Sequence, residues 1–217
     1  MKSLLTTILD TLFPKQEAVV FLEQQALQGN LRSLPHAPKT PERWMHSIFQ
    51  YKNEAVKKLI WEIKYSSNEV LTRETGALLG EEIISFFEEK GLYTSPNWIL
   101  VAVPASFAHT KEKGFNQADK LCKAVIKSVN SDSLTYIPNL LRKTRETKPQ
   151  ASMRNRADRL TNLVGSFTVP KGYQDAVAGK NCIVIDDALT TGSTLREARR
   201  ALGDAGAKTV LGLTLAH

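Results

Sequence analysis

The sequence predicts an α/β protein built on a mostly parallel sheet flanked by helices. Two observations point to this fold class. Short β-branched apolar segments alternate with longer segments of helical apolar spacing, and one such strand runs directly into a polar loop and then a helix. The chain has 217 residues, 42% of them hydrophobic and 24% charged, which suits one domain with a core of its own. No internal repeat is evident, and right-handed crossovers leave few topologies.

The expected elements follow in chain order. Apolar residues at helical spacing predict helices over residues 54–65, 70–87, 116–129 and 195–202, the last capped by Gly203. Runs rich in β-branched and aromatic residues predict strands over residues 98–103, 134–137, 164–169, 182–185 and 209–215. We assign residues 46–217 to the main domain and residues 1–45 to a small N-terminal segment.

The N-terminal segment is expected to begin with a helix. Five apolar residues recur there at helical spacing: Leu4, Leu5, Ile8, Leu9 and Leu12. A mixed segment and a proline-rich connector over residues 35–41 follow. The apolar helix face must pack against either the main domain or a partner chain, and the sequence does not choose between them.

The most informative run lies between residues 183 and 195. A short apolar strand there meets two carboxylates, Asp186 and Asp187, and then a loop of hydroxyl residues around Gly192. Ligands of open α/β sheets bind beyond the carboxyl ends of the strands, where two carboxylates can accept hydrogen bonds from the neighbouring hydroxyls of a ribose. The hydroxyls and backbone N–H groups of residues 190–194, at the start of a helix, suit a phosphate.

The alternative for this run is an ordinary solvated turn with a helix N-cap at Ser193 or Thr194. Capping explains only one of the six polar residues, so we favour a sugar-phosphate site. The chain contains neither the glycine-lysine phosphate loop of nucleotide triphosphatases nor the glycine pattern of dinucleotide-binding proteins.

A second candidate element is the turn Pro104-Ala105-Ser106 after the strand at residues 98–103. If the strands are parallel, this turn lies at the same sheet edge as Asp186, and its small residues let backbone N–H groups approach a ligand. The alternative is a plain strand terminator with Pro104 as the breaker, and the residues alone favour neither.

The third candidate element is a basic segment. Most of the chain's net charge of +7 comes from residues 141–160. Residues 141–160 carry seven basic side chains against Glu146 and Asp158: Arg142, Lys143, Arg145, Lys148, Arg154, Arg156 and Arg159. Such a stretch can bind a pyrophosphate or a nucleic-acid backbone, and the bland alternative is a solvated face. Aromatic residues that could stack bases are missing between Tyr136 and Phe167, which favours phosphate contact over base contact.

The run at residues 183–195 resembles the phosphoribosyl pyrophosphate signature of type I phosphoribosyltransferases: an apolar strand, two acidic residues and a Thr-Thr-Gly-x-Thr loop. Three further stretches resemble elements of the ComF family of competence-associated phosphoribosyltransferase-like proteins. They are Val101-Ala102-Val103-Pro104 with Lys113-Gly114-Phe115-Asn116-Gln117, the basic run 141–150, and Arg156, Arg159 and Asn162 with Gly165-Ser166-Phe167. The resemblance covers about residues 46–217.

The resemblance implies a type I phosphoribosyltransferase fold and roles for individual residues. Asp186 and Asp187 would hold the ribose hydroxyls, and Lys111, Lys113 or Arg145 would offset charge on a departing pyrophosphate. The 5′-phosphate would contact Ala188, Leu189, Thr190, Thr191, Gly192, Ser193 and Thr194, and the pyrophosphate would meet Pro104, Ala105 and Ser106. Magnesium is expected only through the substrate, and no base-reading element identifies the acceptor.

The ComF resemblance also implies a link to DNA uptake or nucleotide salvage, with competence-machinery proteins as partners. The competing hypothesis is a non-catalytic sugar-phosphate sensor that binds single-stranded DNA. Its supporting residues are Arg142, Lys143, Arg154, Arg156 and Arg159.

The N-terminal segment departs from the ComF pattern. Family members usually carry a cysteine-rich zinc ribbon after a Leu-Phe-Pro turn, whereas residues 15–45 here contain no cysteine. His36 and His46 cannot supply four ligands, so we expect no structural zinc. We expect Cys122 and Cys182 to be buried free thiols. The absence of a cleavable leader or of an apolar run of about 18 residues predicts a cytoplasmic protein without membrane insertion.

Overall fold

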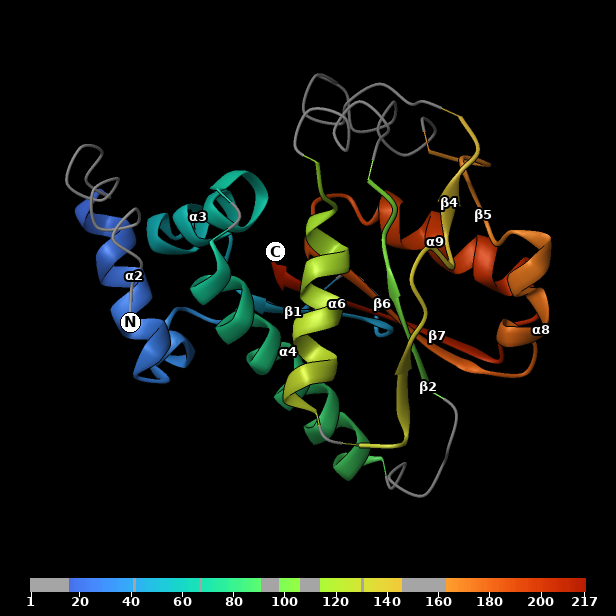
Figure 1. The fold of residues 1–217 in the computed structure, drawn as a ribbon, viewed down its shortest axis with the longest axis horizontal. Helices are drawn as coiled ribbons and strands as arrows, with labels where there is room; N and C mark the ends of the chain where they lie inside the picture. The colour runs from blue at the N-terminus through green and yellow to red at the C-terminus, as the bar shows by residue number, and fades with distance from the viewer. Residues whose placement is uncertain are drawn as a thin grey trace.

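A five-stranded sheet forms the centre of the protein in a computed structural model, which describes residues 16–40, 42–66, 68–90, 98–105, 114–129, 131–145 and 163–217. All four strand pairings in this sheet are parallel, and the strand order is β1-β7-β6-β2-β3. The strands are β1 (Met45–Phe49), β2 (Trp98–Ala102), β3 (Leu134–Tyr136), β6 (Asn181–Ala188) and β7 (Thr209–Ala216). The predicted α/β class with a mostly parallel sheet is confirmed (Figure 1).

Helices cover the sheet and a small hairpin lies beside it. The helices are α2 (Glu17–Leu27), α3 (Glu54–Trp61), α4 (Glu69–Glu89), α6 (Gln117–Ser128), α8 (Gln174–Val177) and α9 (Ser193–Asp204), with a π-helical segment, η2 (Glu62–Ser66), after α3. Short 3₁₀ segments lie at Asn30–Ser33 and Lys171–Tyr173. The hairpin pairs β4 (Arg142–Lys143) with β5 (Phe167–Thr168) in antiparallel fashion.

The two faces of the sheet belong to two separate apolar clusters. Side chains alternate along a strand, so Ile183 and Ile185 of β6 pack with residues of α2, α3, α4 and α6, whereas Cys182 and Val184 pack with α8, α9 and the hairpin. Both cysteines, Cys122 and Cys182, are buried free thiols as predicted, and burial raises the pKa of Cys182 to about 12.

Helices α4 and α6 pack closely on the first face of the sheet. A Cβ added at Gly76 of α4 would lie 2.3 Å from the Cβ of Ala124 on α6, so only glycine permits this approach. Asparagine side chains cap three of the helices, with Asn116 accepting the Ala118 N–H at the start of α6 at 3.0 Å. The position of α6 matters for function because its first residue, Gln117, reaches the candidate site.

The structure refines or corrects several expectations for single elements. The helix expected over residues 54–65 is α-helical only to Trp61 and continues as the π turn η2. The strand expected over residues 164–169 shrinks to β5, which joins the hairpin rather than the main sheet. Helix α9 begins at Ser193 and passes through Gly203, so the left-handed residue after it is Gly206. Gly203 is therefore not the C-cap.

The N-terminal region contributes to the core, which the sequence interpretation missed. Helix α2 and the following 3₁₀ turn place Leu22, Ala26 and Leu31 in the cluster on the α3 and α4 side. The apolar helix expected over Leu4–Leu12 lies outside the described residues. The proposed boundary between residues 45 and 46 stays a prediction, and β1 begins there at Met45. None of the helices in the described ranges is long and apolar enough to cross a membrane.

Candidate functional site

The candidate site begins at the carboxyl end of β6, where Asp186 and Asp187 end a buried central strand. Strand β6 lies between β2 and β7, and its pairing with β2 stops at Ile185 whereas its pairing with β7 continues to Ala188. The Asp187 backbone N–H donates to Asp186 Oδ1 at 2.9 Å. The two side chains follow the alternation of the strand, so Asp187 faces the α3 and α6 layer and Asp186 faces the α9 layer.

Asp187 is buried, and each of its carboxylate oxygens has a partner from a different element. Lys64 Nζ of η2 lies 2.9 Å from Oδ1, and Gln117 Nε2 of α6 donates to Oδ2 at 2.9 Å. Burial alone would lower the pKa of Lys64, but the charge and hydrogen bond of Asp187 raise it above its usual value. Lys64 therefore stays a cation beside the two carboxylates.

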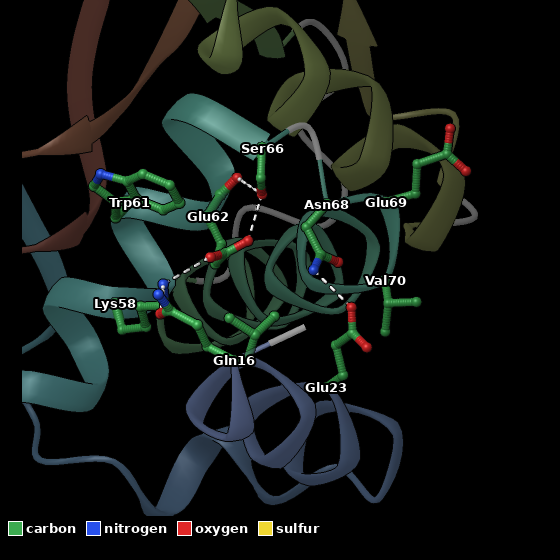
Figure 2. Close-up of a pocket in the computed structure, with 10 residues that line it drawn as sticks. Gln16, Glu23, Lys58, Trp61, Glu62, Ser66, Asn68, Glu69 and Val70 are labelled. Atoms are coloured by element: carbon green, nitrogen blue, oxygen red, sulfur yellow. Dashed lines mark hydrogen bonds and ion pairs between the residues drawn. The ribbon is translucent and has the colours of Figure 1, made fainter. Parts of the chain in front are cut away.

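The π turn that carries Lys64 is closed by its own polar side chains. Ser66 Oγ donates to the Glu62 carbonyl oxygen at 2.8 Å and also contacts the Glu62 carboxylate (Figure 2). Glu62 is buried and forms an ion pair with Lys58 at 3.1 Å, one turn earlier. This network fixes the turn from which Lys64 reaches β6.

Asp186 is half-buried, and its proton affinity is shifted. Burial, and next the charge of Asp187, raise the pKa of Asp186 to about 7, although Lys64 and the Asp187 backbone N–H act in the opposite direction. Within the pair, Asp187 is the carboxylate that contacts the Lys64 ammonium group, and Asp186 is the one whose pKa is raised to near neutrality. Such shifts are common at functional sites.

The loop after β6 turns sharply into α9. Gly192 has a φ of 77°, and a Cβ at that position would lie 3.1 Å from Met45 Cε. Thr191 and Ser193 bring their hydroxyls within 3.0 Å of each other, and Thr190 is exposed. The loop is tied to the sheet by the Leu189 N–H, which donates to the carbonyl of Ala216 on β7 at 2.7 Å.

Gly192, not Ser193 or Thr194, is the N-cap of α9. Glycine has no side chain to cap the helix, so the N-cap at Ser193 or Thr194 that the alternative interpretation expected is wrong. Arg196, in the first turn of α9, donates to the Thr191 carbonyl at 2.9 Å and to Glu42 Oε1 at 2.6 Å. This arrangement leaves the helix N-terminus, with its partial positive charge, next to the loop.

The second candidate element, the turn after β2, is described only at Pro104 and Ala105. The preceding residue, Val103, is held twice, because its N–H donates to Ile185 of β6 at 3.1 Å and its carbonyl accepts the Asn116 side-chain amide at 2.9 Å. Asn116, the residue before α6, is thereby fixed to the same sheet edge as the carboxylates.

A groove of about 940 Å³ runs from this turn to the hairpin. Its basic lining comes from α6 and from the hairpin region: Lys120, Lys123, Arg142, Lys143 and Arg145. Asp119 is the acidic residue in the lining, and it accepts the hydroxyl hydrogen of Tyr136 at 2.5 Å. The groove therefore brings Pro104, Ala105 and the described basic residues of the candidate site together.

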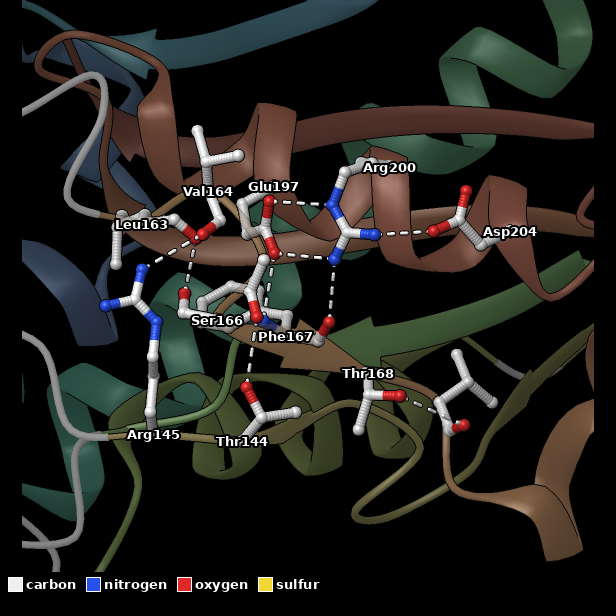
Figure 3. Close-up of polar contacts among 12 residues, drawn as sticks. Thr144, Arg145, Leu163, Val164, Ser166, Phe167, Thr168, Glu197, Arg200 and Asp204 are labelled. Atoms are coloured by element: carbon white, nitrogen blue, oxygen red, sulfur yellow. Dashed lines mark hydrogen bonds and ion pairs between the residues drawn. The ribbon is translucent and has the colours of Figure 1, made fainter.

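The hairpin beside the groove is fixed to α9 by Glu197, which the sequence interpretation did not single out. Its buried carboxylate accepts the Phe167 N–H at 2.9 Å and pairs with Arg200 at 2.7 Å (Figure 3). Burial alone would raise the pKa of Glu197, but the bonds from Arg200 and Phe167 lower it below its usual value. Arg145, after β4, donates to the carbonyl of Val164, before β5, at 3.0 Å.

Other predicted site residues lie outside the described part of the chain. They are Ser106, Lys111, Lys113, Arg154, Arg156 and Arg159. Among the described ones, Asp186, Asp187 and the loop from Ala188 to Thr194 form one continuous unit, and the groove with Arg142, Lys143 and Arg145 forms another. Lys64 is the functional candidate that the sequence interpretation missed, because nothing near it in the sequence links it to β6.

Comparison with known proteins gives a family match and several curated relatives. Residues 148–216 match the family described as phosphoribosyl transferase domain. Competence protein ComFC of Streptococcus pneumoniae is 29% identical over 164 residues, covering 76% of this chain and 64% of that protein. DNA utilization protein YhgH of Escherichia coli O157:H7 is 28% identical over 152 residues, covering 70% and 63%. The chain thus spans slightly less than two thirds of the length of these relatives.

Solved structures with low similarity include two proteins of phosphoribosyl chemistry. Glutamine phosphoribosylpyrophosphate amidotransferase from B. subtilis has a TM-score of 0.43 at 15% identity, covering 71% of this chain and 30% of that one. A hypoxanthine phosphoribosyltransferase from Staphylococcus aureus has a TM-score of 0.34 at 16% identity, covering 73% and 63%.

The family match in the C-terminal part and the parallel α/β sheet confirm the predicted type I phosphoribosyltransferase fold. Together with the curated relatives, they support the predicted resemblance to the ComF family of phosphoribosyltransferase-like proteins.

Proposed function

We propose that this protein binds phosphoribosyl pyrophosphate at the end of β6 and either transfers or recognises its 5-phosphoribosyl group. One observation carries the proposal. Asp186 and Asp187 end the strand, and the next few residues form a glycine turn into a helix whose N-cap, Gly192, has no side chain. Carboxylates that can accept hydrogen bonds from the ribose hydroxyls are thus followed closely along the chain by a helix N-terminus that can bind the 5′-phosphate.

Magnesium fits this proposal as a partner of the ligand. Carboxylate and phosphate oxygens are the donors that the ion prefers, and Lys64 offsets only part of the charge of the two carboxylates. When bound with the ligand, the ion would supply charge neutralisation at the pyrophosphate. The carboxylates of Asp186 and Asp187 would hold the ribose hydroxyls.

If the protein is an enzyme, the reaction is a displacement at the anomeric carbon. The nucleophilic atom of the acceptor forms a bond to that carbon and gives its proton to water, while the bond from carbon to the pyrophosphate oxygen breaks and pyrophosphate leaves with the electron pair. Asp186 and Asp187 would orient the ribose, and Arg145 and Lys113 would stabilise charge on the leaving group. The acceptor is left open because no base-reading element is recognised.

The binding step is tested by calorimetry with phosphoribosyl pyrophosphate and magnesium. The double variant Asp186→Asn with Asp187→Asn should weaken binding at least tenfold, which corresponds to about 1.4 kcal/mol. Asp132→Asn is the matched control, because Asp132 is an exposed carboxylate in the turn before β3. Unchanged affinity in the double variant would refute the site, whatever the catalytic outcome.

Catalysis is tested by a screen for pyrophosphate release across nucleobases, with magnesium present and with single-stranded DNA added or withheld. Release that depends on one base identifies an acceptor. Tight binding of phosphoribosyl pyrophosphate without release under any condition would favour a sensor.

The basic groove favours a second candidate function, binding of single-stranded DNA. Five basic side chains against Asp119 in one groove form a surface that suits a phosphate backbone. The charge-neutralising pair Arg142→Gln with Lys143→Gln should weaken DNA binding and reduce the slope of its salt dependence by about two. The same test extends to Arg154, Arg156 and Arg159.

The names of the curated relatives support a link to DNA uptake and use, and we propose that link for this chain. A role in nucleotide salvage, competence-machinery partners and a cytoplasmic location stay predictions. Fractionation and co-purification from a competent culture would test the last two.

A further inference from the structure

Three elements that are far apart in the sequence meet at the carboxylate of Asp187. Strand β6 supplies the carboxylate, η2 supplies Lys64 and α6 supplies Gln117, each partner at 2.9 Å from its own oxygen. A carboxylate held at both oxygens has a fixed orientation, yet each oxygen keeps capacity for a further donor. The remaining capacity is what a ribose hydroxyl would use.

We propose that Lys64 is a positioning residue of the sugar-phosphate site and acts on the ligand through Asp187. The inference rests on the proposed function, because it assigns a role within the same site. Lys64 fixes the Asp187 carboxylate in an orientation that accepts a ribose hydroxyl and offsets its charge before the ligand arrives.

The local structure around Lys64 supports a dedicated role. Lys64 lies in a π turn, a rare conformation that is frequent at functional sites. That turn is fixed by Ser66 and Glu62, and Glu62 is buried and paired with Lys58. The lysine side chain is 26% exposed and that of Asp187 is 6% exposed, so the ion pair is largely shielded from solvent.

A second observation beside Asp187 indicates a missing hydrogen-bond donor. Gln117 uses its amide N–H on Asp187, and its buried carbonyl oxygen, Oε1, finds no donor among the residues that the structure describes. A buried acceptor without a partner costs about 1–3 kcal/mol. A hydroxyl group at this position would satisfy it, which agrees with a ligand that brings hydroxyl donors to Asp187.

The simpler explanation is an ion pair that only joins η2 to β6. The two explanations differ in how substitutions combine. If Lys64 acts through Asp187, removing either group has the same effect on ligand binding, and removing both adds nothing further. If the pair is only a structural link, the variants change thermal stability and leave the affinity of the folded protein unchanged.

The experiment is a double-mutant cycle on the dissociation constant of phosphoribosyl pyrophosphate with magnesium, measured by calorimetry. Lys64→Met and Asp187→Asn should each weaken binding about tenfold, and the double variant should also lie within about threefold of either single variant. Lys64→Arg, which keeps the cation, should restore most of the affinity. Lys57→Met is the matched control, since Lys57 lies on α3 and pairs with Glu54.

The outcomes separate the inference from the function on which it rests. Multiplicative effects in the double variant, or wild-type affinity in folded Lys64→Met, overturn the positioning role while leaving the site intact. A lower melting temperature with unchanged affinity identifies a structural link and likewise overturns it. A wild-type protein that does not bind phosphoribosyl pyrophosphate overturns the proposed function itself. Circular dichroism of every variant establishes that each one is folded.

Discussion

Replacing Asp186 by asparagine should stabilise the protein at neutral and alkaline pH while weakening ligand binding. Burial and the neighbouring charge of Asp187 make the ionised form of Asp186 costly, so its pKa rises from 3.8 to about 7. Asparagine has nearly the same shape and never ionises. The carboxylate would therefore be retained for ligand binding at the expense of stability, as is common where a site needs a strained group.

The magnitude follows from the difference between the folded and unfolded pKa values. Each pKa unit corresponds to about 1.4 kcal/mol. The folded protein binds the Asp186 proton more tightly than the unfolded chain, so the free energy of unfolding falls as the pH rises from about 4 to about 7. Applying both equilibria gives a loss of at most about 4 kcal/mol at pH 8, of which about 2.5 kcal/mol accumulates between pH 5 and pH 8.

The assay compares the melting temperatures of wild type and Asp186→Asn at half-unit steps from pH 5 to pH 8. For a chain of this size, 1 kcal/mol corresponds to about 2–4 °C. The advantage of the variant should therefore grow by up to roughly 5–10 °C across the series. Groups that do not interact with Asp186 titrate equally in both proteins and cancel in the difference, which leaves the contribution of Asp186 and its immediate charged partners.

A difference in melting temperature that stays constant with pH would refute the reasoning, because it would mean that Asp186 is already ionised at pH 5 in the folded protein. A variant that loses stability relative to wild type as the pH rises would refute even the direction. Asp132→Asn, at an exposed turn, should show a flat difference near zero. The same preparations, titrated with phosphoribosyl pyrophosphate and magnesium, should show that the stabilised variant binds more weakly.

Three further substitutions test the packing around the site. Gly76→Ala should cost about 2–3 kcal/mol in urea unfolding, because its Cβ would lie 2.3 Å from that of Ala124 and force α4 away from α6. Gly192→Ala should cost about 1–2 kcal/mol and weaken phosphate binding, since alanine must adopt a φ of 77° next to Met45. Glu197→Ala should cost about 2 kcal/mol at pH 7. Because the pKa of Glu197 is lowered in the folded protein, its contribution is lost as the pH falls below about 4.5, and acid denaturation curves of the two proteins should converge there.

Gly172→Ala is the control for the glycine substitutions, because nothing lies within 4 Å of an added Cβ there. A loss of stability at Gly172 equal to that at Gly76 would show that close packing is not the cause. For Glu197, a cost that persists unchanged at pH 3 would contradict the role given to its charge.

The parts of the site that could be predicted are those contained in one continuous segment. The strand, the two carboxylates, the hydroxyl loop and the helix of residues 182–204 follow one another along the chain, and each has a local signature in β-branching, glycine or apolar period. The edge strand β1 has no such signature, because His46 and Ser47 interrupt its apolar pattern. The π turn at η2 likewise looks like a continued helix in the sequence.

Contacts between distant segments could not be predicted, because they depend on how the layers come together. Lys64 precedes the sheet strands that surround Asp187, and no local pattern distinguishes it from the other lysines of the same helix. Glu197 has the same character, since its partner Phe167 lies on a hairpin that looked like part of the main sheet in the sequence.

One part of the site was nevertheless implied by elementary strand geometry. Adjacent residues of a strand face opposite sides of a sheet, so Asp186 and Asp187 could not be an equivalent pair once β6 was a central strand. The layer that each one faces then determines its chemistry. Asp187 contacts the Lys64 ammonium group and the Gln117 amide, whereas Asp186 faces the α9 side and has a pKa near neutrality. A ligand that binds both carboxylates must therefore cross the edge of the sheet, which a ribose at the end of β6 with its phosphate at the start of α9 would do.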